Sequence, residues 1–308
     1  MKKGFVSTTL VYSLFIVFIF INVIIVLNYT RKLNYLNTIN EKVESKIKLN
    51  YGMCSNDSDI LLCKIINDNN PVLSDSSVDF TKNSSSTNGE GLLYRTLDSN
   101  KIYYYRGKDV NNFVALGNMC FRIIRSNTSS GVKAIYYGKY SNDMCSNDDG
   151  SLIGYSSSNN LYESSNVKNN LDSFYENNIL KYKNYLEDSV YCADVYNSSI
   201  SLKCFNYSYS VSSYNGNGKL KYPMGLVSAS EVVLSGLSNS YIPNNIWTMS
   251  RSGNNIYVYN NTLVSTSYTS NAYLRGVISF KSSVRVKRGD GKYYSPYVVK
   301  LWKKDLCF

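Results

Sequence analysis

The sequence predicts an α+β protein in which a long N-terminal transmembrane helix precedes a disulfide-stapled head. Three observations lead to this fold class: an uncharged apolar stretch at residues 5–27, six cysteines grouped in three neighbouring couples, and strand-like alternation beyond residue 95. The chain has 308 residues, of which 44% are hydrophobic and 18% are charged. This composition can fill a core and excludes a wholly disordered chain.

The apolar stretch at residues 5–27 carries no charge. In its more apolar half, Asn22 is the only strongly polar side chain. At about 1.5 Å rise per residue a helix of this length crosses the ~30 Å hydrocarbon layer, so we predict a transmembrane segment at residues 5–28. A cleavable secretory signal is the competing interpretation, but Arg31 and Lys32 follow instead of a small-residue cleavage site. Lys2 and Lys3 lie on the other side, so charge alone does not orient the chain.

After Met1 the chain reads KKGF and continues as an apolar helix, which resembles the N-terminus of type IV prepilins and pseudopilins. The resemblance implies that residues 1–4 are a leader, that a prepilin peptidase cuts between Gly4 and Phe5, and that Phe5 becomes N-methylated. The fifth mature residue of that family is usually Glu, whereas it is Thr9 here. This departure indicates a minor or tip subunit, and a plain signal anchor is the alternative.

Residues 29–66 are predicted to form a helical stalk and the start of the head, because apolar residues recur at helical spacing from Leu33 to Ile47. Residues 67–94 are polar and rich in Ser and Asn, which predicts a linker or long loop. Residues 95–308 are assigned to the ectodomain.

The cysteines indicate the compartment. Because short loops close at low entropic cost, we expect neighbours to pair, which is one of several connectivities open to six cysteines: Cys54 with Cys63, Cys120 with Cys145, and Cys192 with Cys204. Disulfides need an oxidising compartment, which places the ectodomain outside the cell. Cys307 is left over near the C-terminus. The alternative is seven reduced cysteines facing the cytosol.

Local patterns place elements within the ectodomain. Alternation predicts strands at residues 101–106, 112–116, 119–125, 132–137, 246–249, 255–259, 274–280, 283–286 and 297–301. Helical spacing predicts a helix over residues 167–188, and residues 205–219 look disordered. Ser228 followed by Glu231 resembles a capping box at the start of a short helix that ends at Gly236.

A second resemblance covers roughly residues 95–300 and is carried by the blocks NMCFRIIR, GVKAIYYG, LDSFYENNIL, LEDSVYC, YPMGLVSASEVVLSG, IWTMS, RGVISFKSSVRV and GDGKYYSPYVV. Their order resembles a surface module of low-GC Gram-positive bacteria, with a tail similar to the formylglycine-generating-enzyme-like variant of the C-type-lectin fold. The segment from Arg275 to Ile278 lacks the Pro of that tail. The resemblance implies a C-type-lectin-like ectodomain and places partner cysteines at the second and third couples.

Several chemistries are excluded or disfavoured. The chain has no His, which removes Ser-His-Asp and Cys-His nucleophiles and His-ligated metal sites, so we expect no cofactor and no metal. The net charge is +11, but the Lys and Arg residues are scattered, so we expect no nucleic-acid binding. A formylglycine-generating enzyme needs a copper-binding cysteine pair, and the coupled cysteines look like structural bridges. Turn chemistry explains the tripeptide Arg288-Gly289-Asp290 better than an adhesive role does.

Aromatic side chains are the remaining candidates for a binding site. Three of them could contact a ligand such as a sugar ring: Tyr257, Tyr259 and Trp247. The alternative is that these rings pack within strands, with Trp247 in the core. We therefore expect a single-pass, non-catalytic protein of the cell membrane with an extracellular ectodomain. Its expected partners are membrane lipid, other pilin-like subunits, and an extracellular glycan or protein. The alternatives are a surface adhesin or glycan-binding module on a plain signal anchor, and a formylglycine-generating-enzyme-like oxidase.

Overall fold

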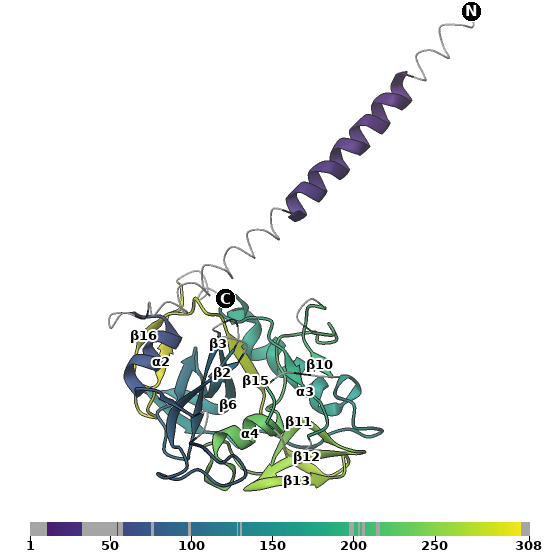
Figure 1. Cartoon of the computed structure of the whole chain (residues 1–308). Helices are drawn as coiled ribbons and strands as arrows, with labels where there is room; N and C mark the ends of the chain where they lie inside the picture. Colours follow the sequence, from purple (N-terminus) through teal and green to yellow (C-terminus); the bar gives the residue numbers. More distant parts are fainter. Residues whose placement is uncertain are drawn as a thin grey trace, which may run out of the picture. The chain divides into compact units, whose positions relative to one another are not determined.

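The computed structural model describes residues 11–32, 54, 58–74, 77–97, 100–127, 129, 131–196, 200–202, 204, 207–213 and 216–302. The chain divides into two compact units, Met1–Lys48 and Leu49–Phe308 (Figure 1). The predicted processing residues Gly4 and Phe5, most of the predicted stalk, and Cys307 lie outside the described residues.

The first unit contains the helix Val11–Lys32, which is long and apolar enough to cross a membrane. Every side chain of this helix is exposed, as expected for a segment whose apolar surface is meant for lipid. Its polar side chains bond to the helix backbone: Asn22 Nδ2 donates to the Phe18 carbonyl at 2.7 Å, and Thr30 Oγ1 donates to the Val26 carbonyl at 2.7 Å. This satisfies polar groups that hydrocarbon could not hydrogen-bond.

The second unit is a mixture of helices and sheets. Its large sheet contains ten strands, with the order β1-β2-β3-β5-β4-β17-β16 and a branch in which β6 pairs with β5, β15 and β7. The strands of this sheet are β1 (Val72–Leu73), β2 (Gly91–Leu97), β3 (Asn100–Arg106), β4 (Phe113–Leu116), β5 (Met119–Ser126), β6 (Val132–Ser141), β7 (Met144–Asn147), β15 (Val277–Phe280), β16 (Val286–Arg288) and β17 (Tyr297–Val299).

Two smaller sheets complete the β-structure. A five-stranded sheet has the order β13-β12-β11-β14-β8, and a two-stranded sheet joins β10 to β9. Their strands are β8 (Leu152–Gly154), β9 (Tyr191–Cys192), β10 (Ser208–Tyr209), β11 (Ile246–Ser252), β12 (Asn255–Asn260), β13 (Thr262–Thr266) and β14 (Asn271–Tyr273). The strands expected at residues 101–106, 119–125, 132–137, 246–249 and 255–259 are confirmed with shifted ends, whereas β8, β13 and β14 were not expected.

Helix α4 (Ala229–Ser235) begins with the expected capping box. Ser228 Oγ accepts from the amide of Glu231 at 3.3 Å, and Glu231 Oε2 accepts from the amide of Ser228 at 2.9 Å. The helix ends at Gly236, whose φ of 117° favours glycine. Helix α4 contacts β3 of the large sheet and β11 and β12 of the five-stranded sheet, so it lies where the two sheets meet (Figure 1).

The helix expected over residues 167–188 is only partly α-helical. Helix α3 (Asn166–Phe174) is followed by a π-helical turn η2 (Tyr175–Ile179) and a 3₁₀ segment η3 (Leu180–Tyr185). Ser165 caps α3, accepting from the amide of Lys168 at 3.0 Å. The stripe of large apolar side chains therefore stays against the core while the backbone changes its winding. The remaining short helices are α2 (Leu61–Asn69), η1 (Tyr162–Ser164) and η4 (Leu237–Asn239).

The segment expected as a linker or long loop, residues 67–94, is part of the second unit. It holds the end of α2, strand β1 and the start of β2, and the side chains of Ser74 and Ser84 are buried. Tyr104 OH donates to Ser74 Oγ at 2.7 Å, and Ser84 Oγ donates to the Asn239 carbonyl at 3.0 Å. Between β1 and β2 the described residues form no helix or strand, and these serines are buried because they are hydrogen-bonded. Strand β10 and the buried Ser210 likewise lie in the stretch expected to be disordered.

One continuous apolar core joins both larger sheets to α3 and α4. Many of its large side chains are tyrosines, and burial raises the pKa of Tyr155, Tyr162 and Tyr191. Packing is close at Gly276, where an added Cβ would lie 2.0 Å from Met224 Cε. A side chain at this position would require the end of the Met224 side chain to move.

Candidate functional site

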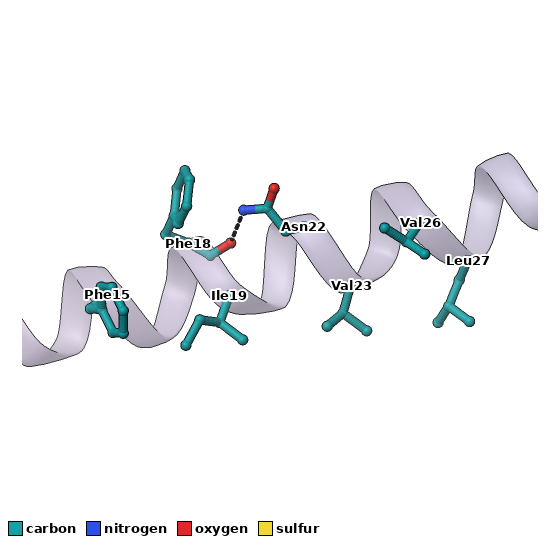
Figure 2. Close-up of a pocket in the computed structure, with 7 residues that line it drawn as sticks. All are labelled: Phe15, Phe18, Ile19, Asn22, Val23, Val26 and Leu27. Atoms are coloured by element: carbon teal, nitrogen blue, oxygen red, sulfur yellow. Dashed lines mark hydrogen bonds between the residues drawn. The ribbon is translucent and has the colours of Figure 1, made fainter.

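A groove runs along one side of the helix Val11–Lys32 (Figure 2). Apart from the Asn22 side chain it is apolar, and it is lined by Phe15, Phe18, Ile19, Asn22, Val23, Val26 and Leu27. Figure 2 shows the Asn22 amide turned back toward the Phe18 carbonyl, with the apolar side chains projecting from the helix. This surface suits acyl chains and has no chemistry for catalysis.

Three disulfides are present, and they join the cysteines expected to pair. Cys54 is bonded to Cys63, with Cα atoms 5.0 Å apart, and thus attaches the chain before α2 to that helix. The other two bridges tie β5 to β7 and β9 to the segment before β10: Cys120–Cys145, with Cα atoms 5.7 Å apart, and Cys192–Cys204, with Cα atoms 5.1 Å apart. These six cysteines are therefore all bonded in pairs, as expected for structural bridges.

Two of the three predicted ligand contacts lie inside the core. Trp247 is 0% exposed, and its indole N–H donates to the Ile153 carbonyl at 2.8 Å. Tyr259 is 1% exposed, and its hydroxyl donates to the Leu237 carbonyl at 2.5 Å. The expectation of surface contact through these residues is corrected, because their polar atoms are already satisfied and their faces are packed. Tyr257, two residues earlier on β12, is half-buried and keeps part of its ring accessible.

Tyr257 takes part in one of two aromatic contacts near the end of β11 that we together call the Tyr257 surface: Tyr196 with Tyr257, and Tyr207 with Arg251. The rings of Tyr196 and Tyr257 meet edge to face, 5.7 Å apart, and the Arg251 guanidinium lies 3.8 Å from the centroid of the Tyr207 ring. Tyr196 comes from the loop closed by Cys192–Cys204, and its amide donates to the Arg251 carbonyl at 3.1 Å. Val195 and Tyr196 thereby lie along β11.

Sequence reasoning missed Tyr196, Tyr207 and Arg251 as members of this surface. A signal for Tyr196 was present in the expected Cys192–Cys204 bridge, because a short closed loop must pack on some neighbour, and Tyr196 is the tyrosine of that loop. The neighbour itself, β11, is distant in sequence and could not be named from the pattern.

A second aromatic feature is the Tyr293 turn, residues 292–295. Tyr293 and Tyr294 are 50% and 51% exposed, and their rings meet edge to face at 5.0 Å. The amide of Ser295 donates to the Lys292 carbonyl at 3.0 Å, and the Tyr293 carbonyl accepts from the amide of Cys145 at 2.7 Å. The turn is thus fixed at both ends while its two rings face solvent.

The tripeptide Arg288-Gly289-Asp290 precedes this turn, and both of its charges are engaged. Arg288 forms an ion pair with Asp143, and Asp290 is 2.8 Å from Lys292 Nζ. Gly289 has a φ of 107°, and an added Cβ would lie 1.8 Å from the Pro296 carbonyl oxygen. Backbone geometry therefore explains the glycine, in agreement with the turn interpretation.

The Glu231 cluster is the most deeply buried group of charges, formed by Arg125, Lys133 and Glu231. Glu231 Oε1 accepts from Arg125 Nε at 2.9 Å and from Lys133 Nζ at 2.9 Å. Burial raises the pKa of Glu231, but the two cations and the Ser228 amide outweigh it and hold the pKa at about 2. Burial lowers the pKa of Lys133 to about 8, since its attraction to Glu231 is offset by repulsion from Arg125. The cluster is closed to solvent, so it connects β5, β6 and α4 without presenting a reactive group.

Among the described residues, no group of three or more Cys, Asp or Glu side chains comes together to hold a metal ion. No family model matches the chain, no curated protein matches it, and no solved structure matches it. What the chain does must therefore follow from its own residues and their geometry.

Proposed function

We propose that this protein is a membrane-anchored, non-catalytic cell-surface protein, with the second unit outside the membrane as a ligand-binding head. The observation that carries the proposal is the combination of a fully exposed, uncharged helical stretch with a disulfide-rich folded unit on one chain. The helix suits a bilayer, and disulfides persist in oxidising compartments, which fits a head beyond the cytoplasmic membrane.

The proposed anchor is pilin-like. The residues KKGF before the apolar helix support cleavage after Gly4, and Thr9 supports a minor subunit rather than the main repeating one. A C-type-lectin-like head is the accompanying fold proposal, supported by the ordered sequence blocks between residues 95 and 300.

The proposed ligand is an extracellular glycan or protein that contacts the Tyr257 surface. Its rings are held by a disulfide loop and a sheet, so little conformational entropy is lost when a ligand binds. Arg251 adds a cationic group with five N–H donors, a donor set that suits hydroxyl and carboxylate oxygens.

Intact-mass analysis of the native protein, before and after reduction, tests the anchor and the compartment together. We expect a chain that begins at N-methylated Phe5 and gains two hydrogens for each of three disulfides on reduction. A chain that retains Met1 contradicts pilin-like processing but leaves a plain anchor standing. A chain that has lost the whole apolar stretch, or that gains no mass on reduction, overturns the proposal of an anchored, oxidised surface protein.

A further inference from the structure

Strand β13 (Thr262–Thr266) is an edge strand that pairs with another strand on one side only. It pairs only with β12, through five consecutive residue pairs with no register shift. Within the described chain, no other backbone-to-backbone hydrogen bond involves residues 262–266. Figure 1 shows β13 at the lower rim of the second unit. One side of this strand therefore offers a row of backbone donors and acceptors.

Four of the other edge strands in the described sheets are protected. Strand β16 carries exposed Lys287 and Arg288 and an irregular register with β17. Strands β1 and β8 have two and three residues, and β7 donates the amide of Cys145 to the Tyr293 carbonyl. Charge, irregularity, shortness and cover are the devices that keep edges from pairing.

Strand β13 carries no charge and has a regular register with β12, and η4 (Leu237–Asn239) is the one element besides β12 that the structure places in repeated contact with it among the described residues. It has five residues, reads TLVST, contains no Pro, and Val264 is 45% exposed. No Asp, Glu, Lys or Arg occurs anywhere in residues 252–274. In a chain of net charge +11, this is a region where two copies can approach without close like-charge repulsion.

The sequence of the strand is also self-complementary. If two copies pair antiparallel about a two-fold axis at Val264, Val264 faces Val264, and each Thr262 faces Thr266 of the other copy. Such Val–Val and Thr–Thr cross-strand pairs are favourable, and the arrangement is isologous and closed. We propose that β13 is a homodimerisation edge, through which the five-stranded sheets of two copies join into one continuous sheet.

A contact of this size is small, and confinement to a membrane surface favours it by raising the effective concentration of the partner. The test therefore uses the full chain in phosphatidylcholine vesicles at low protein-to-lipid ratio. Directly opposed residues of antiparallel strands have Cα atoms about 4.5–5.5 Å apart, within disulfide range. In the proposed register, Val264→Cys cross-links to itself on mild oxidation. Thr262→Cys, on the same strand, does not, because its two copies lie about 14 Å apart.

A charge substitution gives the second measurement. Val264→Lys places two ammonium groups opposite each other, so the dimer detected by amine cross-linking is lost, whereas Ser146→Lys, on exposed β7, leaves it intact. Val264 is exposed, so unchanged circular dichroism is expected for each variant. Any cross-link through Cys307 is measured in the parent chain and subtracted.

The proposal is overturned if Val264→Cys fails to cross-link, or cross-links no more than Thr262→Cys does. A dimer that survives Val264→Lys would place the contact elsewhere, such as on the apolar helix, and would also refute it. Cross-linking of Val264→Cys to a different protein in cells, without self-cross-linking, would show that the edge receives another chain.

Discussion

The Glu231 cluster and the Tyr257 surface each contain a cation in contact with an aromatic ring, but only the cluster is closed to water. In the cluster, Lys133 Nζ lies 4.6 Å from the centroid of the Tyr191 ring and is also neutralised by Glu231. On the surface, Arg251 lies over Tyr207, and no described carboxylate forms an ion pair with it.

The difference teaches where each cation can act. A cation in the core needs partners for its donors, because burial of an unpaired charge is very costly: Glu231 is that partner for Lys133, and backbone carbonyls are the partners of Arg106. Donors engaged in this way are not available to a ligand. A half-buried guanidinium stays solvated on one side, so it can keep donors available. We therefore expect the cluster to determine stability and the Tyr257 surface to determine binding.

The largest effect is expected from Glu231→Gln. The variant leaves Arg125 and Lys133 buried beside each other without a counter-charge, so the free energy of unfolding falls by about 3–5 kcal/mol. The matched control is Glu163→Gln, which breaks the partly exposed pair with Lys219 and costs less than about 1 kcal/mol. Urea denaturation of the full chain in detergent micelles measures both. Equal losses in the two variants would contradict the proposed division between core and surface.

Acid sensitivity is expected to follow from the same cluster. The folded pKa of Glu231 is about 2, below its ordinary value of 4.5, so its stabilisation is fully present above pH 4.5 and is lost as the pH falls toward 2. At about 1.4 kcal/mol for each pH unit, the loss is on the order of 3 kcal/mol. Unfolding free energies of the parent and Glu231→Gln, measured from pH 6 to pH 2, should converge in acid. A constant gap between the two curves would argue against an ionised buried Glu231.

Replacing Cys192 and Cys204 by Ser should distinguish an effect on stability from an effect on the Tyr257 surface. Opening this short loop lowers the free energy of unfolding by about 2–3 kcal/mol in the chain-entropy picture, and it frees Tyr196 from Tyr257. Replacing Cys120 and Cys145 costs a comparable amount but leaves the Tyr257 surface assembled. Hydrogen exchange of the β11 and β12 amides distinguishes the two variants. Equal protection of these amides in both would show that the disulfide loop does not support the surface.

Local patterns in the sequence predicted more of the fold than of the site. The capping box at Ser228 and the three disulfides were readable because each depends on residues close together in the chain. The second role of Glu231, as partner of Arg125 and Lys133, was not readable, because it needs contacts across about a hundred residues. Tyrosine was also ambiguous: thirty occur in the chain, and neighbours such as Tyr257 and Tyr259 differ in burial although they share a strand face.

The smallest effect on stability and the most specific effect on function are expected from Tyr257→Ala. The ring is half-buried, so its loss should cost about 1 kcal/mol of unfolding free energy, whereas edge-to-face and stacking contacts of this size account for up to about tenfold in affinity. The readout is retention of the detergent-solubilised full chain on a glycan and host-protein array. Tyr293→Ala removes a more exposed ring from the Tyr293 turn and serves as the control. Loss of retention in Tyr293→Ala but not in Tyr257→Ala would move the binding site to that turn.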